Sequence, residues 1–146
     1  MALEVPFEGG CMCGALRYEC TEAPAAVVCC HCTDCQRRTG SAFGISVIVP
    51  REAFNKASGK ASSFASQRES GNVVNLKSCV VCGTRCWAEQ EANPKFLVII
   101  GGTLDDAATL QPNAHIYTAT KQSWITFPEG VLTAEAEPDW REVFSV

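Results

Sequence analysis

Residues 79–83 read Cys79-Val80-Val81-Cys82-Gly83, two cysteines separated by two residues and followed by a glycine. This is the spacing of a zinc knuckle, in which both thiolates turn toward one cation. Redox dithiols share the spacing, so the pair needs partners before it indicates a metal. Gly10-Cys11-Met12-Cys13-Gly14 supplies a second pair, with flanking glycines that let the backbone bend. Together Cys11, Cys13, Cys79 and Cys82 predict a closed four-sulfur zinc site that stabilises the fold.

A third group, Cys30-His31-Cys32-x-x-Cys35, has a different character. In extended backbone the side chains of Cys30 and Cys32 point to the same side, and a following helical turn brings Cys35 toward them. His31 then points away, so we expect it to be structural rather than a ligand. Three protein ligands leave the fourth position of a zinc ion to solvent or substrate, which is the arrangement of a reactive site.

Composition narrows the class of protein. The chain has 146 residues, a net charge of −4 and a pI of about 5.2, which argues against a nucleic-acid partner. No apolar run is long enough to span a bilayer, and Met1–Pro6 lacks the features of a signal peptide. A cytoplasmic, reducing location is therefore expected, where clustered cysteines bind metal more often than they form disulfides. The length predicts one domain over residues 1–146. The sequence does not indicate an oligomeric state.

The hydrophobic pattern predicts a mainly β fold with one or two short helical turns. Short apolar or alternating segments predict strands. They are 15–20, 43–49, 73–77, 96–100, 115–117 and 124–127. Residues 33–38, closed by Gly40, predict a short helix, and 51–54 a further turn. Residues 56–63 and 110–113 are small and polar and predict loops. The tail, 129–146, is expected to lie at the periphery, with Trp124, Phe127 and Trp140 packed against the body.

The three-cysteine group favours one kind of chemistry. Three thiolates make zinc a poor activator of water but leave it able to hold a fourth, soft sulfur ligand. Coordination lowers a thiol's pKa, so a small thiol would be captured in its nucleophilic form and could add to an aldehyde. Arg37 and Arg38 follow directly and could bind a carboxylate of that thiol; the alternative is that they are solvated residues on a helix face.

These three cysteine groups occur in one order with characteristic neighbours. The neighbours include Ala15-Leu16-Arg17-Tyr18, Gln36-Arg37-x-x-Gly40-Ser41-Ala42-Phe43, Gly101-Gly102-Thr103-Leu104-Asp105-Asp106, His115-Ile116 and Trp124. Over residues 8–127 the pattern resembles the glutathione-dependent formaldehyde-activating (GFA) family, also called the centromere-protein-V-like zinc domain.

The resemblance implies a zinc-bound β-tent of short antiparallel strands, a fold also found in methionine sulfoxide reductase B. It implies two zinc ions per chain, a structural one at Cys11, Cys13, Cys79 and Cys82 and a reactive one at Cys30, Cys32 and Cys35. The implied reaction joins formaldehyde and glutathione into S-hydroxymethylglutathione, formally a carbon–sulfur lyase activity.

Two other functions remain open. The chain could be a zinc-stabilised binding module without turnover, or a metal or redox buffer that uses its seven grouped thiols. The remaining cysteines, Cys20, Cys29 and Cys86, are expected mainly as small buried hydrophobes. His115 and Trp124 could touch substrate, but a structural role is the commoner one for both.

Overall fold

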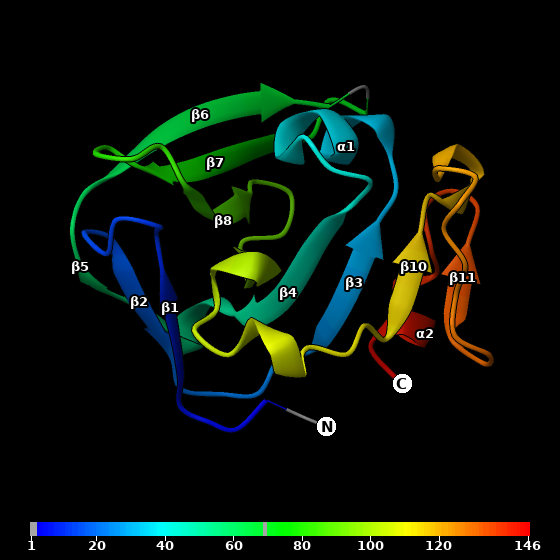
Figure 1. The fold of residues 1–146 in the computed structure, drawn as a ribbon, viewed down its shortest axis with the longest axis horizontal. Helices are drawn as coiled ribbons and strands as arrows, with labels where there is room; N and C mark the ends of the chain where they lie inside the picture. The colour runs from blue at the N-terminus through cyan, green and yellow to red at the C-terminus, as the bar shows by residue number, and fades with distance from the viewer. Residues whose placement is uncertain (1–2, 69) are drawn as a thin grey trace.

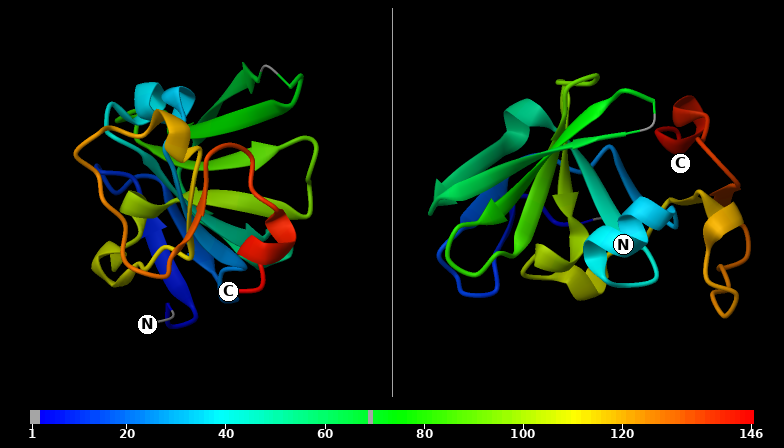
Figure 2. Two further views of the ribbon diagram at one scale, coloured as in Figure 1. Left: turned by 90° about the vertical axis from the view of Figure 1, so that its right-hand side faces the viewer. Right: turned by 90° about the horizontal axis from the view of Figure 1, so that it is seen from above.

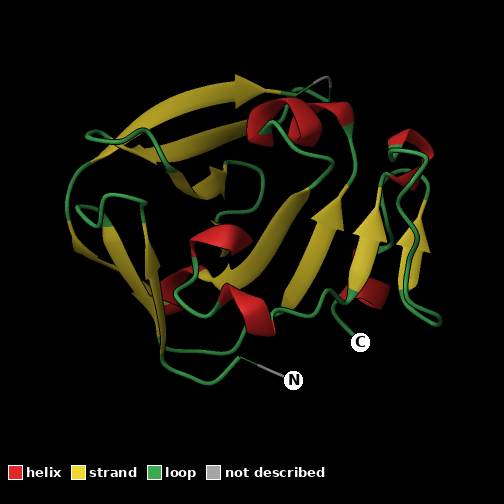
Figure 3. Ribbon diagram, in the orientation of Figure 1, coloured by secondary structure: helices red, strands yellow, loops and turns green. Residues whose placement is uncertain are grey.

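The computed structural model describes residues 3–68 and 70–146 and is built mainly from strands (Figure 1, Figure 3). Strands hold 40% of the residues, and helices together with short 3₁₀ turns hold 16%, so the expected mainly β class is confirmed. The strands are β1 Phe7–Gly10, β2 Arg17–Cys20, β3 Ala26–Cys30, β4 Gly44–Pro50, β5 Phe54–Ser58, β6 Ala61–Gln67, β7 Val73–Cys79, β8 Arg85–Gln90, β9 Phe96–Ile100, β10 Ala114–Ile116 and β11 Leu132–Ala134. The helices are α1 Thr33–Thr39 and α2 Trp140–Val143.

The strands form two sheets. Eight of them lie in the order β11-β10-β3-β4-β9-β8-β7-β6, and β1-β2-β5 form a smaller sheet beside them. Most neighbours are antiparallel, but β10 runs parallel to both β3 and β11. In Figure 1 the large sheet curves from β11 at the right to β6 along the top, and the views of Figure 2 show the same curvature from two other sides.

The alternation of side chains along the large sheet separates two cores. Val47 and Val49 of β4 pack on one face in a cluster that also contains Cys11 and Cys79. Ile48, between them in sequence, packs on the opposite face in a cluster with Val28, Cys30, Cys35 and Ile116. Successive side chains of a strand point to opposite faces. The four-cysteine and three-cysteine groups therefore lie on opposite faces of one sheet.

Helix α1 forms where the sequence predicts it. Cys32 is its N-cap residue and accepts a hydrogen bond from the Cys35 amide through Sγ, at 3.3 Å. Gly40 ends the helix in the left-handed region, at φ 64°, where glycine carries no steric penalty. The short turn at Arg51–Ala53 is also confirmed, as a 3₁₀ turn.

Two expectations about local structure are wrong. Residues 56–63 are not a loop: they fall in β5 and β6, and Gly59, at φ 82°, turns the chain from one sheet to the other. Strand β6 is an edge strand with mostly exposed side chains, so its sequence is polar and lacks the apolar pattern that predicts a strand. Residues 124–127 form no strand, and the Trp124 side chain is 70% exposed instead of packed.

The carboxyl-terminal segment lies against the large sheet. Strand β11 pairs with β10, Val143 of α2 is fully buried, and Trp140 packs on the same core as Ile116. Within the described residues, no helix has the length and apolar character that a membrane crossing requires.

Candidate metal centres and the adjoining cavity

The first candidate centre joins the amino terminus to the β7–β8 turn. The sulfurs of Cys11, Cys13, Cys79 and Cys82 all lie within 4.8 Å of one another. Two of the separations are 3.5 Å, for Cys11 to Cys13, and 3.9 Å, for Cys13 to Cys79. Thiolates at 2.3 Å from a tetrahedral zinc ion lie about 3.8 Å apart, so the donor set fits the ion.

Backbone amides are already directed at these sulfurs. The Leu16 amide donates to Cys11 Sγ at 3.2 Å, and the Val81 amide donates to Cys79 Sγ at 3.4 Å. Hydrogen bonds from the side chain and amide of Thr84 lower the pKa of Cys82 to about 5. Because hydrogen bonds to sulfur stabilise a thiolate, those from Thr84 favour the ionised form of Cys82 that a metal requires.

The second candidate centre holds three sulfurs. Those of Cys30, at the end of β3, and of Cys32 and Cys35, at the start of α1, lie within 4.8 Å of one another. Cys30 and Cys35 are buried and Cys32 is partly exposed. Among the described residues no fourth His, Cys, Asp or Glu belongs to this group. The donor set fits one metal ion with a position left for another ligand.

The ionisation of each of the three thiols affects that of the other two. Hydrogen bonds from Cys30 and then Cys35 lower the pKa of Cys32 to about 2, while the same bond to Cys32 raises the pKa of Cys30. One thiolate is thus stabilised by its neighbours, but further ionisation places like charges together at short range. A bound divalent cation removes this conflict.

The two arginines after the group take different positions. Arg38 Nη2 donates to Cys35 Sγ at 3.0 Å and lines the cavity beside the cysteines. Arg37 is exposed and lines a shallow depression on another side, together with Trp124. The physical reason is helical geometry: residues three apart, such as 35 and 38, share a face, whereas Arg37 is turned about 100° away from Arg38.

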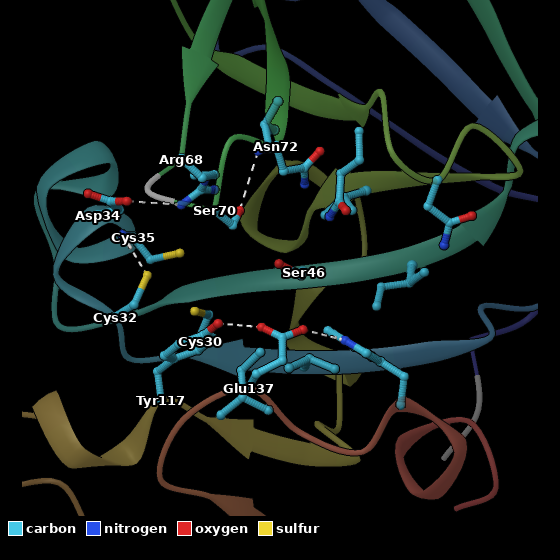
Figure 4. Close-up of a pocket in the computed structure, with 18 of the residues that line it drawn as sticks. Cys30, Cys32, Asp34, Cys35, Ser46, Arg68, Ser70, Asn72, Tyr117 and Glu137 are labelled. Atoms are coloured by element: carbon cyan, nitrogen blue, oxygen red, sulfur yellow. Dashed lines mark hydrogen bonds and ion pairs between the residues drawn. The ribbon is translucent and has the colours of Figure 1, made fainter.

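A cavity of about 740 Å³ opens from the three cysteines across the face of the large sheet. Figure 4 shows the cysteines at one end, with Asp34 and Arg68 on one side and Tyr117 and Glu137 on the other. Arg68 forms an ion pair with Asp34 at 3.2 Å, and the Tyr117 hydroxyl donates to Glu137. Tyr117, expected in a strand, instead follows β10 in the left-handed region, at φ 55°. Nothing in the local sequence marks Arg68, Tyr117 or Glu137 as neighbours of the cysteines.

A buried histidine pair lies behind the three-cysteine centre. His31 Nε2 and His115 Nδ1 are 2.9 Å apart and share one hydrogen bond. The ring centroids of Phe127 and His115 lie 4.4 Å apart, and those of Phe43 and His31 lie 5.1 Å apart. Burial lowers the pKa of both histidines, which favours neutral rings at pH 7. The structural interpretation of His31 agrees with this geometry. Its pairing with His115 was not predicted, because it depends on the parallel pairing of β3 with β10.

Replacing His115 by leucine is expected to destabilise the fold by about 1–3 kcal/mol. His31 Nδ1 is already buried without a hydrogen-bond partner, and the variant leaves Nε2 unpaired as well. Urea unfolding measures the change. Trp124→Leu, at an exposed position, is the control and should stay within about 0.5 kcal/mol. Equal stability of the two variants would contradict a structural role for the histidine pair.

Comparison with known proteins supports the fold and identifies the family. The fold is similar to that of a crystal structure of a Rhodobacter sphaeroides protein, with a TM-score of 0.54 and 17% sequence identity over 87% of this chain and 98% of that one. This likeness supports the fold alone. A search of curated proteins finds no match. The family described as glutathione-dependent formaldehyde-activating enzyme matches residues 6–120, which include all seven clustered cysteines. The chain therefore belongs to the glutathione-dependent formaldehyde-activating enzyme family.

Proposed function

We propose that this chain is a zinc-dependent enzyme of carbon–sulfur lyase type. It would bind a small thiol such as glutathione at Cys30, Cys32 and Cys35 and add it to an aldehyde such as formaldehyde, or reverse that reaction. The observation that supports this most strongly is the three-sulfur group, which has no fourth ligand among the described residues and lies at one end of a cavity of about 740 Å³.

The two centres would have separate roles. Cys11, Cys13, Cys79 and Cys82 would hold a structural zinc ion, and Cys30, Cys32 and Cys35 a second, reactive one. When bound at the three-cysteine centre, zinc would keep an incoming thiol ionised and nucleophilic at neutral pH. That chemistry requires access from the cavity, which the partly exposed Cys32 borders.

The side chains beside the cysteines would do the remaining work. When the thiolate adds to a carbonyl carbon, a carbon–sulfur bond forms and an electron pair moves to the oxygen, which must take a proton. Arg38, 3.0 Å from Cys35 Sγ, would stabilise the negative charge on that oxygen or bind a substrate carboxylate. The Tyr117 hydroxyl faces the same cavity, but burial and its hydrogen bond to the Glu137 carboxylate raise its pKa, so the proton would come from water in the open cavity. Arg37 lies outside this cavity, so we assign substrate binding to Arg38.

Cobalt substitution tests thiol capture directly. Glutathione should change the sulfur-to-cobalt charge-transfer bands of the cobalt-loaded protein, because a new thiolate would join the three-cysteine centre. S-methylglutathione, which has no free thiol, is the matched control and should leave the bands unchanged. Bands that do not respond to glutathione would rule out the proposal.

A binding module without turnover is the second candidate. Met12, Val80 and Val81 are large apolar residues on the loops of the four-cysteine centre, and each is at least 56% exposed. Exposed apolar groups gathered in one place mark many contact surfaces. A silent cobalt titration together with an intact fold would favour this candidate.

A further inference from the structure

The cavity is much longer than formaldehyde chemistry requires. Strand β4 runs along its floor: Gly44 pairs with Cys30 at one end, and Pro50 pairs with Phe96 at the other. The six residue-to-residue steps from Gly44 to Pro50 correspond to about 20 Å. A molecule with two heavy atoms takes roughly the volume of two water molecules, about 60 Å³. Most of the 740 Å³ therefore lies beyond the reacting centre.

The end far from the cysteines is mainly aromatic and aliphatic, and the polar residues Gln90 and Asn93, close to Phe96, also line it. The rings of Phe96 and Phe144 stack with their centroids 5.5 Å apart, and Trp140 lies 5.7 Å from Phe144. Ile48 and Val98, paired across β4 and β9, continue this apolar surface toward the cysteines. Ser46, labelled near the middle of Figure 4, leaves space between the two ends because its side chain is small. We call this part of the cavity, from Ser46 to Phe144, the trough.

The positive charges of the cavity lie at the cysteine end. Among the described residues that line the cavity, the cations are Arg38, which contacts Cys35, and Arg68, which pairs with Asp34. The carboxylate of Glu137 accepts hydrogen bonds from Tyr117 and from Trp140 Nε1, the latter at 2.6 Å. An anionic group of a ligand would thus find a cation near the cysteines, whereas no described residue that lines the cavity beside Phe96 and Phe144 is a cation.

Glutathione is too short to reach the aromatic end of the cavity when its sulfur lies at the cysteines. Glutathione is a tripeptide whose first peptide bond uses the side-chain carboxyl of its glutamate, so it spans roughly 15 Å when extended, and its thiol lies on the central residue. With its sulfur at the cysteines, such a molecule reaches only part of the way along the trough. The remaining length has aromatic and aliphatic side chains that can bury an aryl or alkyl group, beside the amide side chains of Gln90 and Asn93.

We propose that the substrate is a carbon–sulfur adduct with an apolar arm, an aryl-terminated or alkyl chain that lies along β4 and ends against Phe96 and Phe144. The inference rests on the proposed function, since the sulfur of the adduct lies at Cys30, Cys32 and Cys35. The arm takes no part in the bond changes: the carbon–sulfur bond forms or breaks as described above. It could belong to the thiol or to the aldehyde, and its chemistry is the same in both.

Calorimetry with three small probes tests the trough. The probes are 4-phenylbutane-1-thiol, 2-mercaptoethanol and 4-phenylbutan-1-ol, each titrated into the zinc-loaded protein. The phenylbutyl thiol should bind about 10- to 100-fold more tightly than 2-mercaptoethanol, the gain expected from burying a phenylalanine-sized group. Phe144→Ala should remove most of this gain. Phe64→Ala is the control, because Phe64 is 66% exposed on β6 and lies outside the cavity. If Phe144→Ala folds poorly, Phe96→Leu serves the same comparison.

The probes separate this inference from the proposed function. Equal binding of the two thiols, or an equal gain in Phe144→Ala, would overturn the apolar arm and leave thiol capture standing. Binding of the phenylbutyl alcohol that depends on Phe144, with no further gain for the matching thiol, would support the trough and overturn thiol capture.

Turnover then shows which partner carries the arm. Preference for 4-phenylbutanal with glutathione places the arm on the aldehyde, and preference for 4-phenylbutane-1-thiol with formaldehyde places it on the thiol. A higher kcat/KM for formaldehyde with glutathione than for either pair would count against the inference.

Discussion

Replacing Cys13 by alanine is expected to unfold most of the protein, although this side chain is exposed. The reason is that Cys13 lies 3.5 Å from Cys11 Sγ and 3.9 Å from Cys79 Sγ, in the centre that links residues 66 positions apart. A structural zinc site contributes on the order of 10 kcal/mol to folding, which matches the whole stability of a typical domain. Circular dichroism and the zinc content of the purified protein measure the loss.

Met12 provides a matched control on the same loop. It is 86% exposed and neighbours Cys13, but it has no place among the grouped ligands. Met12→Ala should change the free energy of unfolding by no more than about 0.5 kcal/mol. If Cys13→Ala were as stable as Met12→Ala in zinc-containing buffer, the four-cysteine group would not be a structural metal site.

Replacing Cys35 by serine is expected to have the opposite profile: activity is lost and the fold remains. Turnover of glutathione with an aldehyde should fall about 100-fold or more, because one of only three ligands is removed. The melting temperature should fall far less than in Cys13→Ala. The three-cysteine group connects only β3 to the adjacent α1, so it closes a loop of a few residues and constrains the unfolded chain little.

Variants of the two neighbouring arginines test whether turnover depends on side chains that line the cavity. Arg38→Ala should lower turnover about 10- to 100-fold, as removal of a group that contacts a metal ligand does. Arg37→Ala, one residue away and facing outside the cavity, should retain activity. Equal losses of activity in the two variants would mean that activity depends on the total positive charge of α1 and not on the contact between Arg38 and Cys35.

Some features of the chain were predictable because they are formed by residues close together in the sequence. Cysteines two or three positions apart can turn toward one cation, so each local pair and the Cys30-x-Cys32-x-x-Cys35 group were visible in the sequence, and the two pairs together suggested one four-sulfur site. Helix α1 was equally local, since Cys32 caps its start and Gly40 ends it. Strands such as β4 and β9 showed in their apolar runs because buried strands need them. Edge strand β6 was not visible in the sequence, because its side chains are mostly exposed and need not be apolar.

The sequence by itself determined the mainly β class, the two cysteine groups and the family to which the chain belongs. Only the tertiary structure decided the surroundings of the reactive centre. The parallel contact of β3 and β10 brings His115 to His31, 84 residues away. The end of β6 brings Arg68 to Asp34, and the carboxyl-terminal segment places Glu137 and Phe144 over the sheet. These contacts join distant segments through sheet order and curvature, and no local pattern of residues encodes that order.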